Sequence, residues 1–186
     1  MLNNLSNFVS TKAKIPKFLD EFYEENKNNL YKGQTRGEID DETFPLLRKC
    51  NYLPLTDEGM ETFLPFINPL VNAVNDKFYQ YQIDSFELPA IIVYEPGDYY
   101  GWHIDSWGQV GKDEQERKLS YIIQLSDPKD YTGGQVELKY PNGMDILPKK
   151  RGTICVFNST ITHRVRKIKK GKRLALVGWC VGPCWR

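Results

Sequence analysis

Histidine is scarce in this chain, which has only two among its 186 residues, His103 and His163. Other features are also missing. The formal net charge is only +1, so no strong overall field would draw the protein to nucleic acid or to a membrane surface. No apolar run is long enough to span a bilayer, and the first residues lack the basic start and apolar stretch of a signal peptide. We therefore expect a cytoplasmic location and no membrane partner.

Cysteine is sparse as well, with four residues in the chain. A disulfide framework is not expected in the absence of a secretion signal. The spacing of Cys180 and Cys184 could suggest zinc, but zinc fingers and ribbons usually pair two such groups. Cys155 lies in an apolar run and is predicted to be a small core residue.

The two histidines occur in a pattern typical of a metal site. His103 and Asp105 are separated by one residue, and alternate residues of a strand share a face, so both side chains would project together. Folding would bring His163 to them from another strand. Two imidazoles and one carboxylate on one face of Fe(II) leave coordination positions open for chemistry. The alternative is that these histidines are ordinary hydrogen-bonded structural residues.

The first half of the chain is predicted to be helical. Pro16 precedes an amphipathic stretch at 17–26, and a longer apolar stripe covers 57–78. Proline inside a helix removes a hydrogen bond, so we expect a break or kink in the second helix at its two prolines, Pro65 and Pro69. The segment 1–15 is expected to be loosely held, and 26–41 is expected to form a loop.

From Leu88 onward the pattern changes to short runs of period two that are rich in β-branched residues. Many short strands with turn signals between them are typical of a sandwich or a barrel, so the pattern alone predicts a mostly β fold. The predicted strands are 90–94, 102–104, 119–125, 135–140, 145–147, 153–157, 163–168 and 173–181.

Longer motifs surround both histidines. The first reads Tyr94-x-x-Gly97-x-x-Tyr100-x-x-His103-x-Asp105, and the second reads His163-x9-Arg173. Between and after them come Arg117-Lys-Leu-Ser-Tyr, Leu125-Ser-Asp-Pro, Gly133-Gly134 and the ending Leu176-Val-Gly-Trp-Cys-Val-Gly-Pro183. This order resembles the prolyl-4-hydroxylase-like, Fe(II)- and 2-oxoglutarate-dependent dioxygenases, and the ending is similar to their PKHD-type hydroxylase branch, common in bacteria and bacteriophages. One departure is Gly133-Gly-Gln-Val-Glu-Leu138, where the family often has Gly-Gly-Glu-Leu.

The resemblance covers about residues 88–186 and implies a fold. It predicts a double-stranded β-helix, or jelly roll, with the N-terminal helices packed on one sheet. A chain of this length suits one well-buried core, so a single domain over 1–186 is expected. Residues 1–87 would form a helical support region, and 88–186 would form the catalytic core.

The resemblance also implies roles for individual residues. His103, Asp105 and His163 would bind Fe(II). Arg173 would bind the far carboxylate of 2-oxoglutarate, which a planar, permanently charged guanidinium suits. The alternative for Arg173 is membership of the basic run 164–172 before it. The other residues expected around 2-oxoglutarate are Tyr94, Trp179, Ser120 and Gln124, and the weaker candidates for lining the substrate entrance are Tyr100 and Trp102.

The activity implied is hydroxylation of an unactivated C–H bond, with O₂ consumed and 2-oxoglutarate converted to succinate and CO₂. Ascorbate is an additional candidate cofactor. A peptidyl residue such as proline is the favoured substrate, in the cytoplasm of a bacterial or phage-infected cell. The alternatives are a free amino acid or small metabolite, nucleic acid, and a jelly-roll binding module without catalysis.

Two further segments have candidate roles. The basic turn 164–172, together with 149–151, is either a solvated hairpin or a docking patch for an acidic substrate. The stretch 106–117 contains glycine and charged residues and follows the predicted metal-binding strand, so it is a candidate lid.

Overall fold

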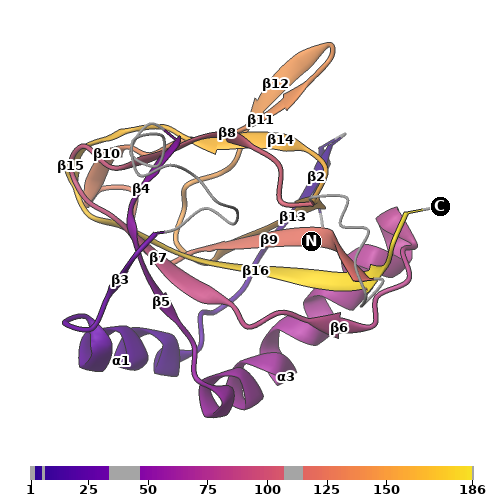
Figure 1. Cartoon of the computed structure of the whole chain (residues 1–186), viewed down its shortest axis with the longest axis horizontal. Helices are drawn as coiled ribbons and strands as arrows, with labels where there is room; N and C mark the ends of the chain where they lie inside the picture. The colour runs from indigo at the N-terminus through magenta and orange to yellow at the C-terminus, as the bar shows by residue number, and fades with distance from the viewer. Residues whose placement is uncertain (1–2, 6, 34–46, 107–114, 186) are drawn as a thin grey trace.

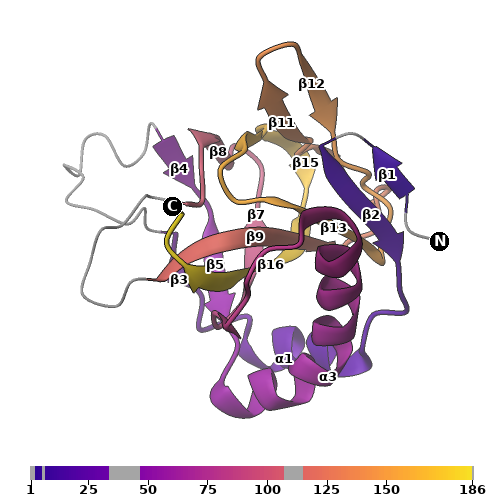
Figure 2. The same ribbon diagram turned by 90° about the vertical axis from the view of Figure 1, so that its right-hand side faces the viewer.

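The computed structural model describes residues 3–5, 7–33, 47–106 and 115–185 (Figure 1). Within these residues two antiparallel sheets face each other, and both helices lie on the outer side of the larger sheet (Figures 1 and 2). The protein is a double-stranded β-helix of the jelly-roll kind, with helices on one sheet, as the family resemblance implied.

The larger sheet contains most of the strands. Its order is β1 (Asn3–Leu5), β2 (Phe8–Lys12), β13 (Thr153–Asn158), β9 (Gln115–Gln124), β16 (Arg173–Pro183), β7 (Ala90–Tyr94), β5 (Asn51–Pro54) and β3 (Tyr31–Lys32), with β6 (Ser85–Phe86) paired to β16. The smaller sheet has the order β12 (Gly143–Ile146), β11 (Val136–Tyr140), β14 (Thr162–Val165), β8 (Tyr99–His103) and β4 (Arg48–Lys49). A third pair joins β10 (Tyr131–Gly133) and β15 (Ile168–Gly171).

The larger sheet is buried on both faces. One face packs on helices α1 (Lys17–Asn26) and α3 (Asp57–Val74), and the other faces the smaller sheet. Every residue of β7 is therefore buried, which explains its uninterrupted apolar run. Ile91 and Val93 point to the helices, whereas Ile92 and Tyr94 point between the sheets. Alternation along each strand thus decides which residues reach the space between the sheets.

The second helix differs from its prediction. Thr56 caps its start by accepting a hydrogen bond from the Gly59 N–H at 3.1 Å, and α3 then continues across both prolines without a break. Pro65 and Pro69 are exposed, on the side away from the buried face, so water can satisfy the carbonyls that lose their helical partners. The helix ends in a single π-helical turn, η1 (Asn75–Tyr79). Neither helix is long and apolar enough to cross a membrane, in the part of the chain that the structure describes.

The expectation of a loosely held start was wrong for residues 8–12. Strand β2 pairs with β13, and the side chains of Phe8 and Val9 are only 2% exposed. The predicted loop at 26–41 also contributes a short strand, β3, which pairs with β5. These strands are short and flanked by polar residues, so their local sequence carries little β signal and their pairing partners lie far away in the chain.

The strands predicted from residue 90 onward are confirmed, with small shifts at their ends. One prediction needs correction, because 163–168 forms two strands and not one. β14 ends at Val165, and β15 begins at Ile168 in a different sheet. The predicted small core residue Cys155 is buried between the sheets.

We expect Phe8→Ala to destabilise the protein by roughly 3–5 kcal/mol, because it removes a fully buried aromatic ring that the rest of the core cannot replace. Lys12→Ala, on an exposed position of the same strand, is the control. Denaturant unfolding measures both variants. Equal stabilities would mean that β2 does not belong to the folded core.

Candidate active site

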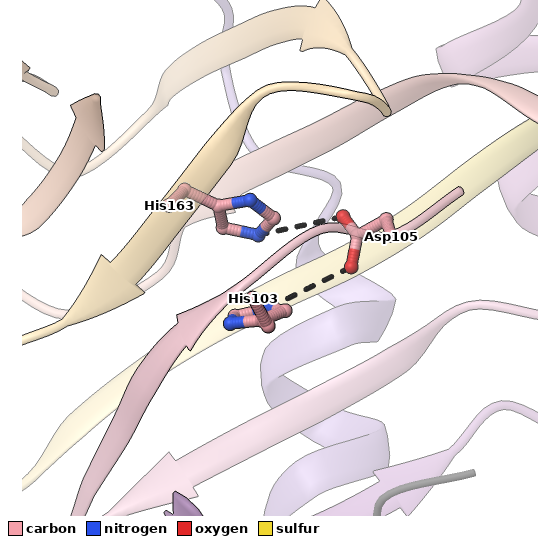
Figure 3. Close-up of side chains that lie close together, drawn as sticks. All are labelled: His103, Asp105 and His163. Atoms are coloured by element: carbon pink, nitrogen blue, oxygen red, sulfur yellow. Dashed lines mark ion pairs between the residues drawn. The ribbon is translucent and has the colours of Figure 1, made fainter. Parts of the chain in front are cut away.

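The two histidines lie opposite each other on neighbouring strands. His103 ends β8, His163 lies in β14, and the two are direct cross-strand partners. Asp105 follows two residues after the end of β8, where its backbone N–H donates to the Ser159 carbonyl at 2.9 Å. Figure 3 shows the three side chains converging on one point between the sheets.

The three side chains are close enough to share a metal ion. Asp105 Oδ1 is 3.7 Å from His103 Nε2, and Asp105 Oδ2 is 3.5 Å from His163 Nε2. One ligand atom of each residue lies within 4.8 Å of the others, and no second group of this kind occurs in the described ranges. The predicted proximity of His103, Asp105 and His163 is therefore what the fold produces.

Hydrogen bonds orient both imidazoles toward this point. Nδ1 of His103 is 2.8 Å from the Gly101 carbonyl, and Nδ1 of His163 is 2.9 Å from the Ile161 carbonyl. A carbonyl oxygen can only accept, so each Nδ1 carries a proton, and the neutral form of each ring keeps a free lone pair on Nε2. This is the tautomer that a metal ligand needs, held by the backbone of the residue two positions earlier.

Electrostatics favours the metal-binding protonation states. Burial, followed by the neighbouring His163, lowers the pKa of His103 from 6.5 to about 3, so this ring is neutral at physiological pH. Burial alone would raise the pKa of Asp105, but the two imidazoles and the Ser120 hydroxyl outweigh it and lower this pKa. The Ser120 Oγ donates to Asp105 Oδ2 at 2.7 Å. Two neutral imidazoles and one carboxylate suit a borderline divalent ion such as Fe(II), so the donor set fits the predicted metal.

A bulge separates the two aromatic residues that were predicted at the substrate entrance. His163 pairs with His103, and Val165 pairs with Tyr100. An advance of two residues along β14 therefore matches an advance of three residues along β8, which contains the extra residue. Residues three apart in a regular strand point to opposite faces, and the extra residue reverses this. The Tyr100 ring therefore stacks on the His103 ring, with centroids 3.5 Å apart and planes 11° apart.

Trp102 lies away from the cavity beside the metal cluster. Its ring is covered by the Arg164 guanidinium at 4.3 Å and by the Lys139 ammonium at 5.8 Å, and it is absent from the cavity lining. The sequence prediction placed both Tyr100 and Trp102 at the substrate entrance. The bulge leaves only Tyr100 on the inner face.

Arg173 is buried on the opposite side of the space between the sheets, on the inner face of the larger sheet. Its side chain is 2% exposed, and one terminal nitrogen donates to Gln124 Oε1 at 3.0 Å. Its Nε has no hydrogen-bond partner, and no Asp or Glu of the described residues forms an ion pair with it. Leaving a cation unpaired in the interior is costly, so this position favours an anionic ligand.

Local backbone geometry makes room for the Arg173 stem. Gly134 has a φ of +61°, which disfavours any side chain, and a Cβ there would come within 3.0 Å of Arg173 Cδ. A Cβ on Gly134 would come still closer to Ile168 Cδ1, and a Cβ on Gly133 would clash with the Lys167 carbonyl, so the Gly133-Gly134 motif is explained by close packing against 167–169 as well as against Arg173. The alternative that Arg173 merely continues the exposed basic run is excluded by its burial.

The remaining residues predicted around 2-oxoglutarate share this inner face. Tyr94 is the cross-strand partner of Arg173, and its ring centre is 5.5 Å from the guanidinium. Trp179 of β16 is the cross-strand partner of Ser120 in β9. Gln124 follows Ser120 by an even number of residues in β9, so their side chains point to the same face. The indole of Trp179 lies near enough to Asp105 to lower the pKa of that carboxyl, although its N–H makes no hydrogen bond of standard geometry in the described structure.

A cavity of about 400 Å³ opens beside the metal cluster. Apolar side chains of β7, β9 and β16 form much of its wall, and Tyr94, Tyr100 and Trp179 add aromatic rings. Arg173, Ser120 and Gln124 do not line it, so Arg173 lies just behind the wall at Tyr94.

Three charged residues of the cavity wall received no role from the sequence. Arg117 forms a two-point ion pair with Glu87 at 2.7 and 2.5 Å, and its guanidinium lies 3.7 Å from the centre of the Trp179 ring. Arg48 lies 4.7 Å from the centre of the Tyr100 ring. Arg48 comes from a two-residue strand in a segment without a predicted strand, and no local signal marks it.

The basic turn is more ordered than a purely solvated hairpin. Arg164 and Arg166 both pair with the buried Glu137, and Lys172 pairs with Glu95 at 3.2 Å. Whether the rest of the turn docks an acidic partner stays a prediction. The candidate lid at 106–117 falls largely at 107–114, outside the described residues.

Comparisons with known proteins agree with this geometry. The family described as the 2OG-Fe(II) oxygenase superfamily matches residues 89–181. A PKHD-type hydroxylase from Crocosphaera subtropica is 36% identical over 86 residues, which cover 46% of this chain and 39% of that protein. A PKHD-type hydroxylase from Prochlorococcus marinus is 32% identical over 116 residues, covering 58% and 51%. The matches thus span only two fifths to one half of these relatives.

Solved structures share the fold. A prolyl-4-hydroxylase from Pseudomonas putida superposes with a TM-score of 0.70 at 19% identity, covering 94% of this chain and 91% of that one. A prolyl hydroxylase from Trichoplax adhaerens, in complex with a peptide fragment of hypoxia inducible factor, superposes with a TM-score of 0.73 at 16% identity, covering 94% and 83%.

The family match covers half of the chain and includes all three residues of the metal cluster. The chain therefore belongs to the 2OG-Fe(II) oxygenase superfamily.

We expect Asp105→Ala to abolish tight Fe(II) binding while the protein stays folded, because the two histidines lose the only carboxylate of their cluster. Anaerobic titration with Fe(II) measures the binding, and circular dichroism checks the fold. Asp84→Ala, which removes an exposed carboxylate, is the control and should bind Fe(II) like the unchanged protein. Unaltered Fe(II) affinity in Asp105→Ala would refute the assignment of this site.

Proposed function

We propose that the protein is an Fe(II)- and 2-oxoglutarate-dependent dioxygenase that hydroxylates an unactivated C–H bond. The observation that carries this proposal is the combination, in the space between the two sheets, of a two-histidine, one-carboxylate cluster and a buried arginine without a carboxylate partner among the described residues. Bound iron, with 2-oxoglutarate and O₂, would supply the oxidation, and 2-oxoglutarate would leave as succinate and CO₂.

The residues of the site would have separate roles in binding the metal and the co-substrate. His103, Asp105 and His163 would hold the metal, and Arg173 would bind the far carboxylate of 2-oxoglutarate with a charge-assisted pair. Gln124 holds one terminal nitrogen of Arg173, so it would fix the guanidinium in place. Its own amide is oriented by a hydrogen bond from Nε2 to the Pro148 carbonyl at 3.1 Å.

Tyr94 and Trp179 would form the walls around the bound co-substrate. Burial raises the pKa of Tyr94, so its phenol stays protonated and can act as a donor. Trp179 lies beside Asp105 on one side and under Arg117 on the other, which restrains its ring. Ser120 would act on the metal ligand Asp105, to which it donates, more directly than on 2-oxoglutarate. The apolar cavity wall would exclude water from the reacting atoms.

A peptidyl residue, with proline favoured, is the proposed substrate. The support is the name of the relatives and the fold shared with prolyl hydroxylases, one of which holds a peptide. An extended peptide would lie over the cavity mouth, with Tyr100 as an aromatic contact beside the metal. Ascorbate as an additional cofactor stays a prediction, as does the cytoplasmic location.

We expect Arg173→Ala to raise the Michaelis constant for 2-oxoglutarate about tenfold or more, because a lost charge-assisted pair is worth roughly 1.5–3 kcal/mol. Arg173→Lys, which keeps the charge but loses the planar fork, should fall between. Lys169→Ala, in the exposed part of the basic turn, is the control. The reverse pattern, with Lys169→Ala impaired and Arg173→Ala normal, would move the co-substrate site into the turn.

The substrate class is tested by succinate release and by mass spectrometry of candidate substrates. Proline-containing peptides should stimulate succinate formation and gain one oxygen atom. Free amino acids and oligonucleotides, supplied in parallel, should do neither. An oxidised nucleobase or free amino acid, with all peptides unchanged, would overturn the peptidyl proposal. Succinate formed without any oxidised candidate would retain the dioxygenase and reject these substrates.

A further inference from the structure

The residues next to the two histidine ligands meet on the outer face of the smaller sheet. Trp102 precedes His103 in β8, and Arg164 follows His163 in β14. Because neighbouring residues of a strand point to opposite faces, Trp102 and Arg164 lie behind the cluster that the histidines form. The Arg164 guanidinium covers the Trp102 ring at 4.3 Å, so the two ligand strands are in contact on both faces.

A buried acid extends this contact to a third strand. Glu137 of β11 is 1% exposed and is the cross-strand partner of Arg164. Its Oε2 is 2.7 Å from Arg164 Nε, and its Oε1 is 2.6 Å from Arg166 Nε. With both oxygens paired, Glu137 holds Arg164 in one orientation over the tryptophan. Only Glu137 is buried in these pairs, so removing Arg164 would leave a buried carboxylate with the exposed Arg166 as its one remaining ion-pair partner among the described residues.

The position of this contact coincides with the bulge in β8. The register between β8 and β14 changes between His163 and Val165, so the ladder is irregular beside the metal cluster. A slip of one residue in a strand sends every side chain to the other face. At this place a slip would carry His103 out of the cluster and bring Trp102 into it. The regular ladder is thus interrupted beside the metal cluster, where the main chain adds hydrogen bonds from Asp105 and Ser106 to the Ser159 carbonyl.

We propose that Trp102, Arg164 and Glu137 form an outer clamp, which positions His103 opposite His163 for metal binding. The clamp rests on the proposed iron site, but its residues touch neither the metal position nor the cavity. They act through the strands that carry the ligands. The Trp102 ring blocks slippage because its face is held by Arg164, and Glu137 prevents Arg164 from turning away.

The test measures Fe(II) affinity and stability separately. Trp102→Ala and Arg164→Ala should weaken anaerobic Fe(II) binding by about tenfold, the lower end of the losses seen when groups supporting metal ligands are removed. Trp102→Phe keeps an aromatic face for Arg164 and should restore most of the affinity. Arg151→Ala removes a surface arginine that pairs with Asp20 and is the matched control, with unchanged affinity expected.

A second measurement uses the metal-free protein. In Trp102→Ala, the nuclear Overhauser contacts between the stacked Tyr100 and His103 rings should weaken, whereas Trp102→Phe should keep them. If Trp102→Ala does not fold, Arg164→Lys serves instead, since it keeps the charge and loses the planar stack.

The outcomes separate the clamp from the proposed function. Wild-type Fe(II) affinity and intact ring contacts in a folded but less stable Trp102→Ala would overturn the clamp and leave only a packing contact. Failure of the unchanged protein to bind Fe(II) would instead overturn the iron site, and the clamp with it.

Discussion

Strands β8 and β14 pair so that His103 stands opposite His163, and the candidate active site depends on this pairing. The backbone then supplies what the ligands need. A carbonyl two residues earlier in each segment accepts a hydrogen bond from Nδ1–H, and the turn after β8 returns Asp105 between the two Nε2 atoms. Both imidazoles are thus held in one tautomer before any metal arrives, which reduces the reorganisation that binding would require.

The larger sheet supplies the rest of the site because it is covered on both faces. Its helix-facing residues form one core, and the alternate residues face the smaller sheet. Arg173, Tyr94, Ser120 and Trp179 belong to the second set through the register of β16 with β7 and β9. Gln124 binds one terminal nitrogen of the buried Arg173, whereas its Nε has no hydrogen-bond partner within the described residues.

Charged side chains around the site form ion pairs within the fold. Glu137 pairs with two arginines of the basic turn, and Glu87 pairs with Arg117 at the cavity wall. Much of the apparent basic cluster of the sequence is therefore paired within the described structure. Arg164 and Arg117 make the same pair of contacts. In each, one face of the planar guanidinium lies on a tryptophan ring, and its edge binds a carboxylate. Lysine could not replace either contact, since it lacks the flat fork.

Local patterns in the amino-acid sequence determined a large part of the secondary structure. The strands from residue 90 onward and the helix at 17–26 were predictable, because each depends on alternation or periodicity within a few residues. The proximity of His103 and Asp105 was predicted as well, but the turn after β8 produces it and not a shared strand face. Resemblance to a family added Arg173 and its neighbours. Strand β2 and the wall residue Arg48 were not predictable, since each is placed by a partner far away in the chain. The separation of Tyr100 from Trp102 was decided only by the tertiary structure. A bulge changes the face of every residue beyond it, and its position follows from how β8 pairs with β14, which no local period records.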